Sequence, residues 1–358
     1  MRILYIGYQS ISLNDSGGAL GCIRNYQSIL RLCGEENLTT IILKNTSKPS
    51  FFHKIVNNFH RVFKKDAFDY GPALIEDYFQ YDIIFIDSSR LGNIAKKIAL
   101  SGFKGKIVTF YHNFDYKFVD GQYKDDSIKH WINLRVSLKN ERNAAKYSTN
   151  NIVLNSRDEK ELKDFYGIEN SFLIPVSLPD RFLSANVYEN PFGNLKGKVF
   201  LFLGSHFFGN IIGLDWFMEN VYPYVDINFV VVGKDMHKLK KNPLYKDVKI
   251  FSNVNNVTPF VVNADCMLYP IIGGSGMKIK TCEALMFGKN IIGSEEAFEG
   301  YDVDFDKVGA CCSSKEDYIY AINNFNKARF NQYSRESYIQ KYSFDATLKL
   351  FKQVLTNK

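Results

Sequence analysis

A glycine-rich segment in the second half of the chain carries residue types that suit the binding of a nucleotide diphosphate. Three of the four residues 273–276 are glycines, and a helix is predicted to begin right after them at Met277. Glycines let the backbone approach a ligand closely, and the free N–H groups at the start of a helix favour an anion. Lys278 and Lys280 add positive charge there, and the carboxylate of Glu283 can accept hydrogen bonds from sugar hydroxyls. The segment therefore predicts a site for phosphates and a ribose.

These side chains also have plainer explanations, which the sequence leaves open. Glu283 could pair with Lys280 three residues earlier, a surface contact that contributes only about 0.2–0.5 kcal/mol. Lys278 could be a solvated lysine, although a cation at the start of a helix opposes the helix dipole unless an anion is bound. Because both residues follow the glycines at this spacing, we expect Lys278 to bind phosphate and Glu283 to bind the ribose.

Further candidates lie in the first half of the chain. Gly17 and Gly18 precede a predicted helix and form either a functional loop or an ordinary turn. His112 ends an apolar strand at the edge where parallel sheets bind ligands, so it could hydrogen-bond a sugar hydroxyl or have a structural role. The carboxylate of Asp115 could orient an acceptor or cap the segment before Tyr116.

Short apolar strands that alternate with helical segments must position these candidates. The first half of the chain predicts strands at Arg2–Tyr8, Leu38–Leu43, Asp82–Asp87, Lys106–His112, Asn151–Leu154 and Ser171–Pro175. After residue 197 the pattern starts again, with strands at Lys198–Gly204, Ile227–Gly233, Val248–Phe251, Asp265–Tyr269, Asn290–Ile292 and Val308–Cys311. Apolar strands separated by helices predict an α/β protein with parallel, doubly wound sheets.

The segment 178–197 is rich in proline and glycine and is the best linker candidate. We therefore predict an N-terminal Rossmann-like domain of residues 1–178 and a C-terminal Rossmann-like domain of residues 179–335. A cleft is expected between them, where the ends of the strands face each other. The amphipathic segment 336–358 is expected to close back on the N-terminal domain.

Composition and charge exclude several classes of protein. Of the 358 residues, 46% are hydrophobic and 23% are charged, as in soluble globular proteins, and no apolar run reaches the about 18 residues of a membrane span. The N-terminus enters a strand directly and does not resemble a signal peptide, and the six cysteines show no CxxC spacing. We expect reduced thiols in a cytoplasmic protein with no metal site. The net charge of +7 suits anionic small molecules or an anionic membrane, and no nucleic-acid motif accompanies it.

Taken in order, these segments resemble a retaining glycosyltransferase of the GT-B fold, in the family-4-like group (glycosyl transferases group 1). The resemblance rests on residues 15–18, 111–115, 155–159, 201–205, 210–217, 230–233, 253–254, 261–265 and 273–289. It implies that Asp15, Gly17 and Gly18 face the donor phosphate and the acceptor, and that His112 lies near the reacting sugar. It also implies that Asn253 and Val254 border the donor base.

The resemblance places the diphosphate and ribose at Gly274, Ser275, Gly276, Met277, Lys278 and Glu283, the last at the family's second glutamate. Two departures concern the donor. The family often has a glutamate eight residues before the second one, and Ser275 stands there. Many members also have an arginine and a lysine for the phosphates after the first strand of the donor domain, where this chain has Ser205 and Asn210.

The resemblance implies transfer of a hexose-type sugar from a UDP- or GDP-linked donor to a hydroxyl of a glycan or lipid-linked acceptor. It implies retention of configuration, no metal or other cofactor, and a role in bacterial surface polysaccharide or glycoconjugate synthesis. His112 and Lys278 are the predicted catalytic residues, with Asp15 and Asp115 on the acceptor side. A non-catalytic GT-B subunit that stabilises or targets an active partner is the alternative that Ser275 supports. A GT-B-like sugar-nucleotide epimerase is disfavoured by the acceptor-side pattern.

The segment 51–65 gives a separate signal. Its phenylalanine and aliphatic residues fall on one helical face, no acidic residue interrupts it, and its basic residues lie elsewhere, at Lys54, Arg61, Lys64 and Lys65. Such a helix can lie on an anionic bilayer, which would place the protein at the inner face of the membrane. The alternative is a helix that faces the core and has a basic outer side.

Overall fold

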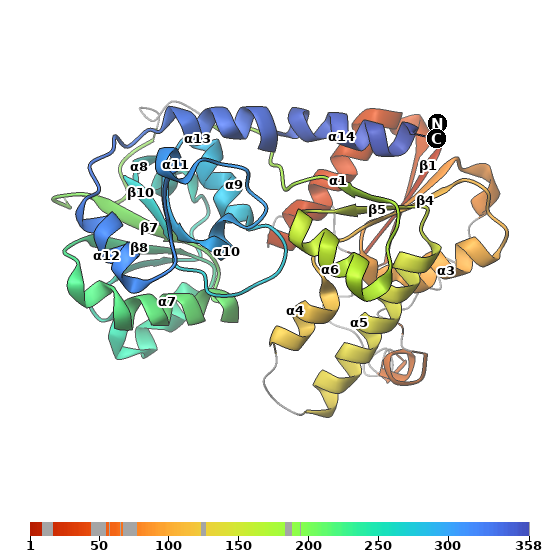
Figure 1. Cartoon of the computed structure of the whole chain (residues 1–358), viewed down its shortest axis with the longest axis horizontal. Helices are drawn as coiled ribbons and strands as arrows, with labels where there is room; N and C mark the ends of the chain where they lie inside the picture. The colour runs from red at the N-terminus through yellow and green to blue at the C-terminus, as the bar shows by residue number, and fades with distance from the viewer. Residues whose placement is uncertain are drawn as a thin grey trace. The chain divides into compact units, whose positions relative to one another are not determined.

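The computed structural model divides into two compact units (Figure 1). Unit 1 comprises Met1–Pro175 and Thr347–Lys358, and unit 2 comprises Val176–Ala346. The division predicted from the sequence places the boundary after residue 178 and the return of the chain at residue 336. The structure describes residues 1–8, 17–43, 55–56, 58–64, 66, 77–122, 127–182, 188–193 and 195–357. Asp15 lies outside the described residues, as do Ser16, Phe51, Phe52, Lys54, Asn57 and Lys65.

Unit 1 is a six-stranded parallel sheet with helices on both faces. Its strands are β1 (Ile3–Gly7), β2 (Leu38–Ile42), β3 (Ile83–Ile86), β4 (Lys106–Phe110), β5 (Asn150–Val153) and β6 (Ser171–Leu173), in the order β2-β1-β3-β4-β5-β6. Its helices are α1 (Gly17–Cys33), α3 (Gly92–Leu100), α4 (Asp115–Gln122), α5 (Ile128–Tyr147), α6 (Ser156–Tyr166) and the part of α14 (Phe344–Thr356) from Thr347 onward.

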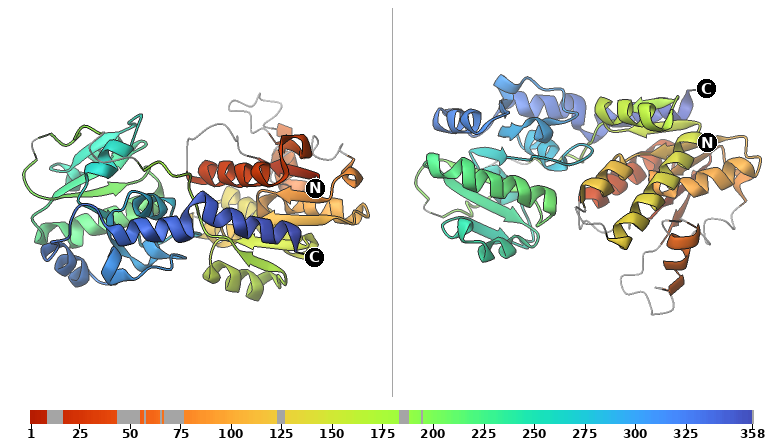
Figure 2. Two further views of the ribbon diagram at one scale, coloured as in Figure 1. Left: turned by 90° about the horizontal axis from the view of Figure 1, so that it is seen from above. Right: turned by 60° about the horizontal axis from the view of Figure 1, so that its bottom comes forward.

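The helix α1 and the C-terminal part of α14 lie side by side on one face of this sheet, and α3 and α5 lie on the other (Figures 1 and 2). The ring of Phe351 in α14 lies 6.3 Å from that of Phe85 in β3 and 6.4 Å from that of Phe110 in β4. The guanidinium of Arg24 in α1 lies over the rings of Phe110 and Phe351. The two ends of the chain therefore share one hydrophobic core.

Unit 2 repeats the architecture. Its strands are β7 (Val199–Leu203), β8 (Asn228–Gly233), β9 (Lys249–Ser252), β10 (Cys266–Tyr269), β11 (Asn290–Ser294) and β12 (Gly309–Cys312), in the order β12-β11-β10-β7-β8-β9. Its helices are α7 (Phe208–Asn220), α8 (Thr258–Asn263), α9 (Ile279–Met286), α10 (Glu295–Phe298), α11 (Phe305–Val308), α12 (Lys315–Asn323) and α13 (Gln332–Ser337). Every pair of neighbouring strands is parallel, so the prediction of two doubly wound α/β units is confirmed.

The central strands of both sheets are buried along their whole length, as the near-continuous apolar runs predict for strands covered on both faces. In unit 2, Phe217 of α7 and Tyr318 of α12 contact each other over the sheet, with ring centroids 6.2 Å apart. The candidate functional residues of the two units stand at the carboxyl ends of these strands.

Candidate functional site

The glycine-rich segment lies where the direction of strand connection reverses in the unit 2 sheet. The first strand of the unit, β7, is the neighbour of β10, and the helices that follow these two strands, α7 and α9, lie on opposite faces (Figure 1). In open α/β sheets, ligands bind outside the carboxyl ends of strands at this kind of position. Ser205 and Asn210 follow β7 and residues 271–278 follow β10, so both predicted donor segments reach it.

The helix after the glycines begins two residues later than the sequence predicts. Lys278 is extended, with φ −84° and ψ 107°, so α9 begins at Ile279 and not at Met277. The hydroxyl of Tyr301 fixes this start, because it donates to the carbonyl of Lys278 at 2.8 Å and accepts from the N–H of Cys282 at 3.1 Å. The first turn of the helix was predicted at Met277. The hydroxyl of Tyr301, from a later segment, instead hydrogen-bonds the backbone at Lys278 and Cys282.

Lys278 has an acidic partner that the local sequence does not show. Its Nζ lies 2.6 Å from Oε1 of Glu296, at the start of α10, and 3.0 Å from the carbonyl of Gly276. Both side chains are largely buried. Gly274 has a positive φ, and a Cβ there would stand 3.1 Å from Nζ, so glycine leaves room for this ion pair. The side chain of Lys278 is therefore fixed by an ion pair beside the glycine-rich segment and is not a solvated lysine.

Lys280 lies beside the first donor segment. Its Nζ donates to Oδ1 of Asn210 at 2.6 Å, and the amide of Asn210 donates to the carbonyl of Ser205 at 2.8 Å. The ammonium lies 4.4 Å from the ring centroid of Phe202. Burial, with a smaller contribution from Lys278, lowers the pKa of Lys280 to about 7. A second lysine thus stands beside Ser205 and Asn210, the first predicted donor segment.

Glu283 is buried in α9 and keeps one carboxylate oxygen available. Its Oε1 accepts from Nη2 of Arg181 at 2.6 Å. Among the residues that the structure describes, Oε2 has no hydrogen-bond donor, and Lys280 turns to Asn210 instead. Burial raises the pKa of Glu283, and Arg181 opposes this shift. The pairing of Glu283 with Lys280 is therefore absent, and Oε2 is free to accept a hydroxyl.

The remaining donor-side candidates form the backbone around this position. Gly276 has φ 63°, and Ser275 is half-buried between the two glycines. Asn253 follows β9 with φ 57°, and its side-chain oxygen accepts from the N–H of Asp235 at 2.9 Å. Val254 is half-buried beside it. These residues shape a loop surface, and their proposed contacts with a nucleotide rest on the family resemblance.

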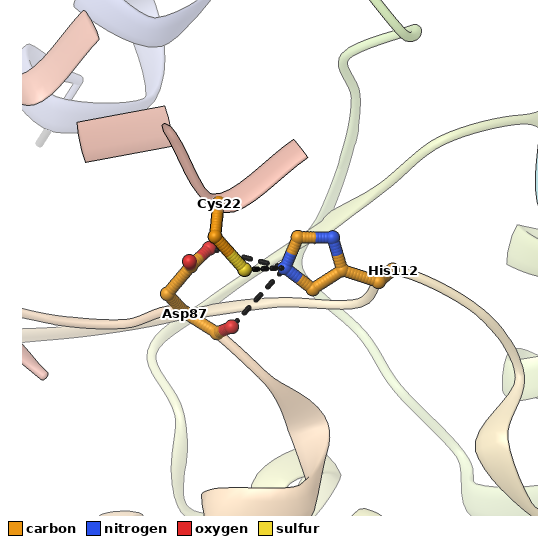
Figure 3. Close-up of side chains that lie close together, drawn as sticks. All are labelled: Cys22, Asp87 and His112. Carbon is orange, nitrogen blue, oxygen red and sulfur yellow. Dashed lines mark hydrogen bonds and ion pairs between the residues drawn. The ribbon is translucent and has the colours of Figure 1, made fainter. Parts of the chain in front are cut away.

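In unit 1, His112 forms part of a buried cluster (Figure 3). It follows β4 and lies against Asp87, which follows β3, and Cys22 of α1. Its Nε2 lies 3.2 Å from Oδ1 of Asp87 and 3.6 Å from Sγ of Cys22. In this sheet the direction of strand connection reverses between β1 and β3, which are neighbours. The cluster lies at this position of unit 1, as the glycine-rich segment does at the β7/β10 position of unit 2. Gly17 and Gly18 are the first residues of α1, rather than a loop before it.

Asp115 has a dense set of partners within unit 1. Its carboxylate accepts from Oγ of Ser89 at 2.8 Å and from Nε of Arg90 at 3.2 Å. It is the first residue of α4, and Glu141 caps that helix by accepting from the N–H groups of Asp115 and Tyr116. Burial, and then Asp115, raises the pKa of Glu141. These contacts favour the structural alternative for Asp115 over an acceptor contact.

Three partners were missed at the level of sequence, namely Asp87, Arg181 and Glu296. Asp87 was placed at the end of a predicted strand, as His112 was, and that position was the available signal. Arg181 stands in the predicted linker and Glu296 follows β11, so neither has a spacing that connects it to the glycine segment. The fold brings them together from 102 and 18 residues away in the chain.

Comparisons with known proteins concern the sequence of unit 2 and the fold of the whole chain. Residues 197–323 match the family of glycosyl transferases group 1. No curated protein matches the chain in sequence. Among solved structures, a sucrose-phosphate synthase from Thermosynechococcus elongatus is similar with a TM-score of 0.72 at 14% identity, over 100% of both chains.

Two more solved structures are similar over the same length. HepE from Anabaena, in complex with UDP and glucose, has a TM-score of 0.64 at 10% identity and covers 100% of both chains. A glycosyltransferase from Rickettsia africae has a TM-score of 0.62 at 15% identity, over 100% of this chain and 99% of the other. The chain thus has the GT-B fold, and its residues 197–323 are similar in sequence to the glycosyl transferases group 1.

Proposed function

We propose that this protein transfers a hexose-type sugar from a nucleotide-diphosphate donor to an acceptor hydroxyl, with retention of configuration. One observation carries the proposal. Lys278, Lys280 and the open oxygen of Glu283 belong to one short stretch at the β7/β10 reversal, within the segment that matches the family. Two cations and a hydroxyl acceptor at this spacing suit a diphosphate followed by a ribose.

The proposed roles follow from charge. Departure of the sugar leaves negative charge on the diphosphate, and fixed cations and N–H groups stabilise that charge without reorganisation. Lys278 and Lys280 supply the positive charge, with the backbone at Gly274 and Gly276 as the close-approach surface. Oε2 of Glu283 accepts from the ribose, and His112 of unit 1 accepts from or donates to a hydroxyl of the sugar. A phosphate oxygen of the leaving group takes the acceptor proton, so no separate base is required.

The donor is proposed to be UDP- or GDP-linked, without a bound metal or other cofactor. HepE binds UDP and glucose in its solved structure, which supports a UDP-linked donor. The two lysines supply the charge that a metal ion would otherwise supply to the diphosphate. A role in bacterial surface polysaccharide synthesis is part of the same proposal and rests on the family resemblance.

The acceptor is proposed to be carried on an anionic membrane. Among the described residues, no helix has both the length and the apolar character that a membrane crossing needs. Unit 1 nevertheless exposes large apolar side chains on the segment 58–64 and on the first turn of α5, where Phe63 is 70% exposed, Ile128 78% and Trp131 52%. The side chain of Arg61 donates to Asn133, which holds the segment 58–64 against α5.

Basic residues lie next to these apolar residues in the sequence. Lys64, Lys129 and Arg135 are exposed, and the guanidinium of Arg135 lies 4.2 Å from the ring centroid of Trp131. No acidic residue occurs between Ser127 and Asn140. Apolar side chains that enter the lipid, flanked by cations that meet the headgroups, are what binding to an anionic bilayer requires. The alternative of a core-facing helix does not fit Phe59 and Phe63, because both side chains are exposed.

The competing function is that of a non-catalytic subunit, which Ser275 in place of the family glutamate favours. It predicts that the chain binds no nucleotide. Calorimetric titration of UDP, GDP and dTDP into the wild type and into Lys278→Ala and Glu283→Ala separates the two functions. We expect one nucleotide to bind, and each variant to lose about 1.5–3 kcal/mol of binding free energy, the contribution of hydrogen bonds to charged groups.

Glu296→Gln is the matched control for Lys278→Ala. It removes the acidic partner of Lys278 and keeps the lysine, so it should leave binding unchanged or strengthen it. Incubation with UDP- and GDP-sugars, scored for hydrolysis or transfer, then tests turnover. Absence of binding by all three nucleotides, in a wild type that unfolds cooperatively, would exclude the transferase and leave the subunit function.

A further inference from the structure

The cluster of Cys22, Asp87 and His112 has more hydrogen bonds than a contact between His112 and a sugar would need. Figure 3 shows the three side chains converging from α1, from the residue after β3 and from the segment after β4. The side chain of Asp87 is fully buried, and that of His112 is 16% exposed. Asp87 is not part of the predicted site, and its burial needs an explanation because an ionised carboxylate is costly to bury without partners.

Asp87 is surrounded by hydrogen-bond donors. The hydroxyl of Tyr5 in β1 donates to its Oδ2 at 2.5 Å, and the amide of Asn25 in α1 donates to its Oδ1 at 2.5 Å. Tyr5 and Asn25 are themselves fully buried. These contacts hold the carboxylate in one orientation, with Oδ1 facing His112.

The contacts of His112 favour one ring nitrogen as the carrier of the proton. Nε2 lies 3.1 Å from the backbone carbonyl of Asp87 and 3.2 Å from Oδ1 of the same residue. A backbone carbonyl accepts and never donates, so a proton on Nε2 satisfies both oxygens, and Sγ of Cys22 at 3.6 Å is a longer third contact of this nitrogen. In the neutral imidazole the other nitrogen, Nδ1, is then a hydrogen-bond acceptor.

We propose that Asp87 is a positioning residue that holds His112 in the Nε2–H form, so that Nδ1 accepts a hydrogen bond from a hydroxyl of the bound sugar. Nδ1 points away from Asp87 and Cys22 (Figure 3), and it has no partner among the residues that the structure describes. Glycine at position 21 leaves room beside Nδ1, because a Cβ at that position would stand 3.2 Å from this nitrogen. The identity of the hydroxyl as that of a sugar rests on the proposed function.

A metal ion is the competing explanation, since one ligand atom from each of Cys22, Asp87 and His112 lies within 4.8 Å of the others. The hydrogen bonds disfavour it. Both oxygens of Asp87 already accept from Tyr5 and Asn25, and the Nε2 that would bind the metal faces a backbone carbonyl. Burial, and then Asp87, raises the pKa of the Cys22 thiol, so the thiolate that a metal prefers is suppressed.

The decisive measurement is the tautomer of His112 in the free protein. NMR of protein labelled with ¹⁵N-histidine, assigned by comparison with His112→Asn, should show the proton on Nε2 in the wild type. In Asp87→Asn the neighbouring amide can present either its oxygen or its NH₂ group, so this preference should be lost. A proton on Nδ1 in the wild type would overturn the proposal, as would an equimolar amount of zinc in the purified protein or an unchanged tautomer in Asp87→Asn.

A pair of variants tests which nitrogen acts. The side-chain oxygen of asparagine can take the place of Nδ1, whereas the terminal amide of glutamine lies near the place of Nε2. His112→Asn should therefore retain more turnover than His112→Gln. Asp87→Asn should lower kcat roughly tenfold with little change in affinity for the nucleotide, the effect of one hydrogen bond of about 1.4 kcal/mol. Equal turnover in the two His112 variants would contradict a role for Nδ1.

These outcomes separate this inference from the proposed function. If the wild type shows the Nε2–H form but binds no nucleotide and turns over no donor, the proposed function fails and Asp87 still orients His112. If the nucleotide binds and the sugar is transferred while the proton lies on Nδ1, the proposed transferase function is supported. The proposed role of Asp87 is then wrong. Asp82→Asn, which is exposed and directly precedes β3, is the control for the substitution itself.

Discussion

Lys280 combines a short hydrogen bond, an aromatic contact and an unusual pKa. Its ammonium donates to Asn210 and lies near the ring of Phe202, and its pKa of about 7 leaves it partly neutral near neutral pH. A diphosphate beside it would favour the charged form, and so would raise the pKa when it binds. Under the proposed function, binding of the nucleotide would therefore be coupled to uptake of a proton by this side chain.

This coupling predicts how affinity depends on pH. Above pH 7 the free protein holds Lys280 increasingly neutral, so binding must add the proton, and affinity for UDP or GDP should fall as pH rises from 7 to 9. Full coupling gives a loss of up to about tenfold per pH unit, which is 1.36 kcal/mol. The phosphates are already ionised over this range, because their last pKa is about 6.

Calorimetry at pH 7, 8 and 9, in buffers of different ionisation enthalpy, measures both the affinity and the proton uptake. Lys280→Met keeps the apolar stem against Phe202 and should abolish the pH dependence, whereas Lys278→Ala should lower affinity and keep it. A wild-type affinity that stays constant over this range would show that Lys280 does not contact the phosphates.

For single residues, the sequence predicts which side chains belong to the candidate site better than it predicts which residues contact them. Lys278 and Glu283 stand out because a glycine segment precedes them at a spacing that suits phosphate and ribose. Their partners come from distant positions. Asn210 is 70 residues from Lys280 and Arg181 is 102 from Glu283, so only the fold can reveal these pairs. The same holds for Asp87, whose donors Tyr5 and Asn25 belong to other elements.

At the scale of elements, close contact between α7 and the segment after β10 sets the position of the glycine-rich loop. A Cβ on Gly213 of α7 would stand 1.8 Å from the carbonyl oxygen of Pro270, so only glycine allows this approach. Pro270 lies three residues before Gly273, where the glycine-rich segment begins. The N-terminus of α7 is close to the loop as well, since a Cβ on Gly209 would meet the carbonyl of Gly273 at 3.4 Å.

Gly213→Ala should therefore destabilise unit 2 and displace the loop. An added methyl group in a packed core costs about 1–3 kcal/mol, and here it meets backbone that cannot turn aside. Urea unfolding measures the loss, and titration with the nucleotide measures the displacement of the loop. Gly121→Ala in α4 is the matched control, because a Cβ there meets nothing within 4 Å. Equal stability of the two variants would show that α7 shifts freely on the sheet.

The elements were predictable from the sequence because parallel strands buried on both faces give continuous apolar runs. The twelve predicted strands all occur, each within a few residues of its predicted bounds. Strand order was not predictable, because it depends on which strands pair across the sheet. The start of α9 was misplaced for a related reason, since the hydroxyl that fixes it belongs to Tyr301, beyond the next strand.

At the scale of the whole molecule, the apolar and basic surface of unit 1 predicts reversible binding to an anionic membrane. Each basic side chain near such a surface contributes about 1 kcal/mol, so the change of Arg61, Lys64, Lys129 and Arg135 to glutamine should abolish co-sedimentation with phosphatidylserine vesicles. Phe63→Ser with Trp131→Ser should weaken it without changing the charge. Moderate salt should weaken binding of the wild type, because ions screen the attraction.

Vesicles of phosphatidylcholine alone are the control for the lipid, and nucleotide affinity is the control for the fold of each variant. The basic variant should still bind the nucleotide, since its changes lie in unit 1 and the lysines of the glycine segment lie in unit 2. Sedimentation of the basic variant to the same extent as the wild type would exclude an electrostatic membrane contact.

The way the chain returns to unit 1 has a consequence for the synthesis of the protein. Unit 2 is continuous in the chain, so it can fold as soon as Ala346 has left the ribosome. The core of unit 1 lacks Phe351, Val354 and Leu355 until α14 emerges, and these three side chains are almost fully buried in the folded protein. Each nascent chain therefore holds a complete second unit and an unfinished first unit that exposes the aromatic surface of Phe85 and Phe110. A ribosome that stalls between codons 347 and 358 would release a protein that chaperones and proteases recognise by this surface.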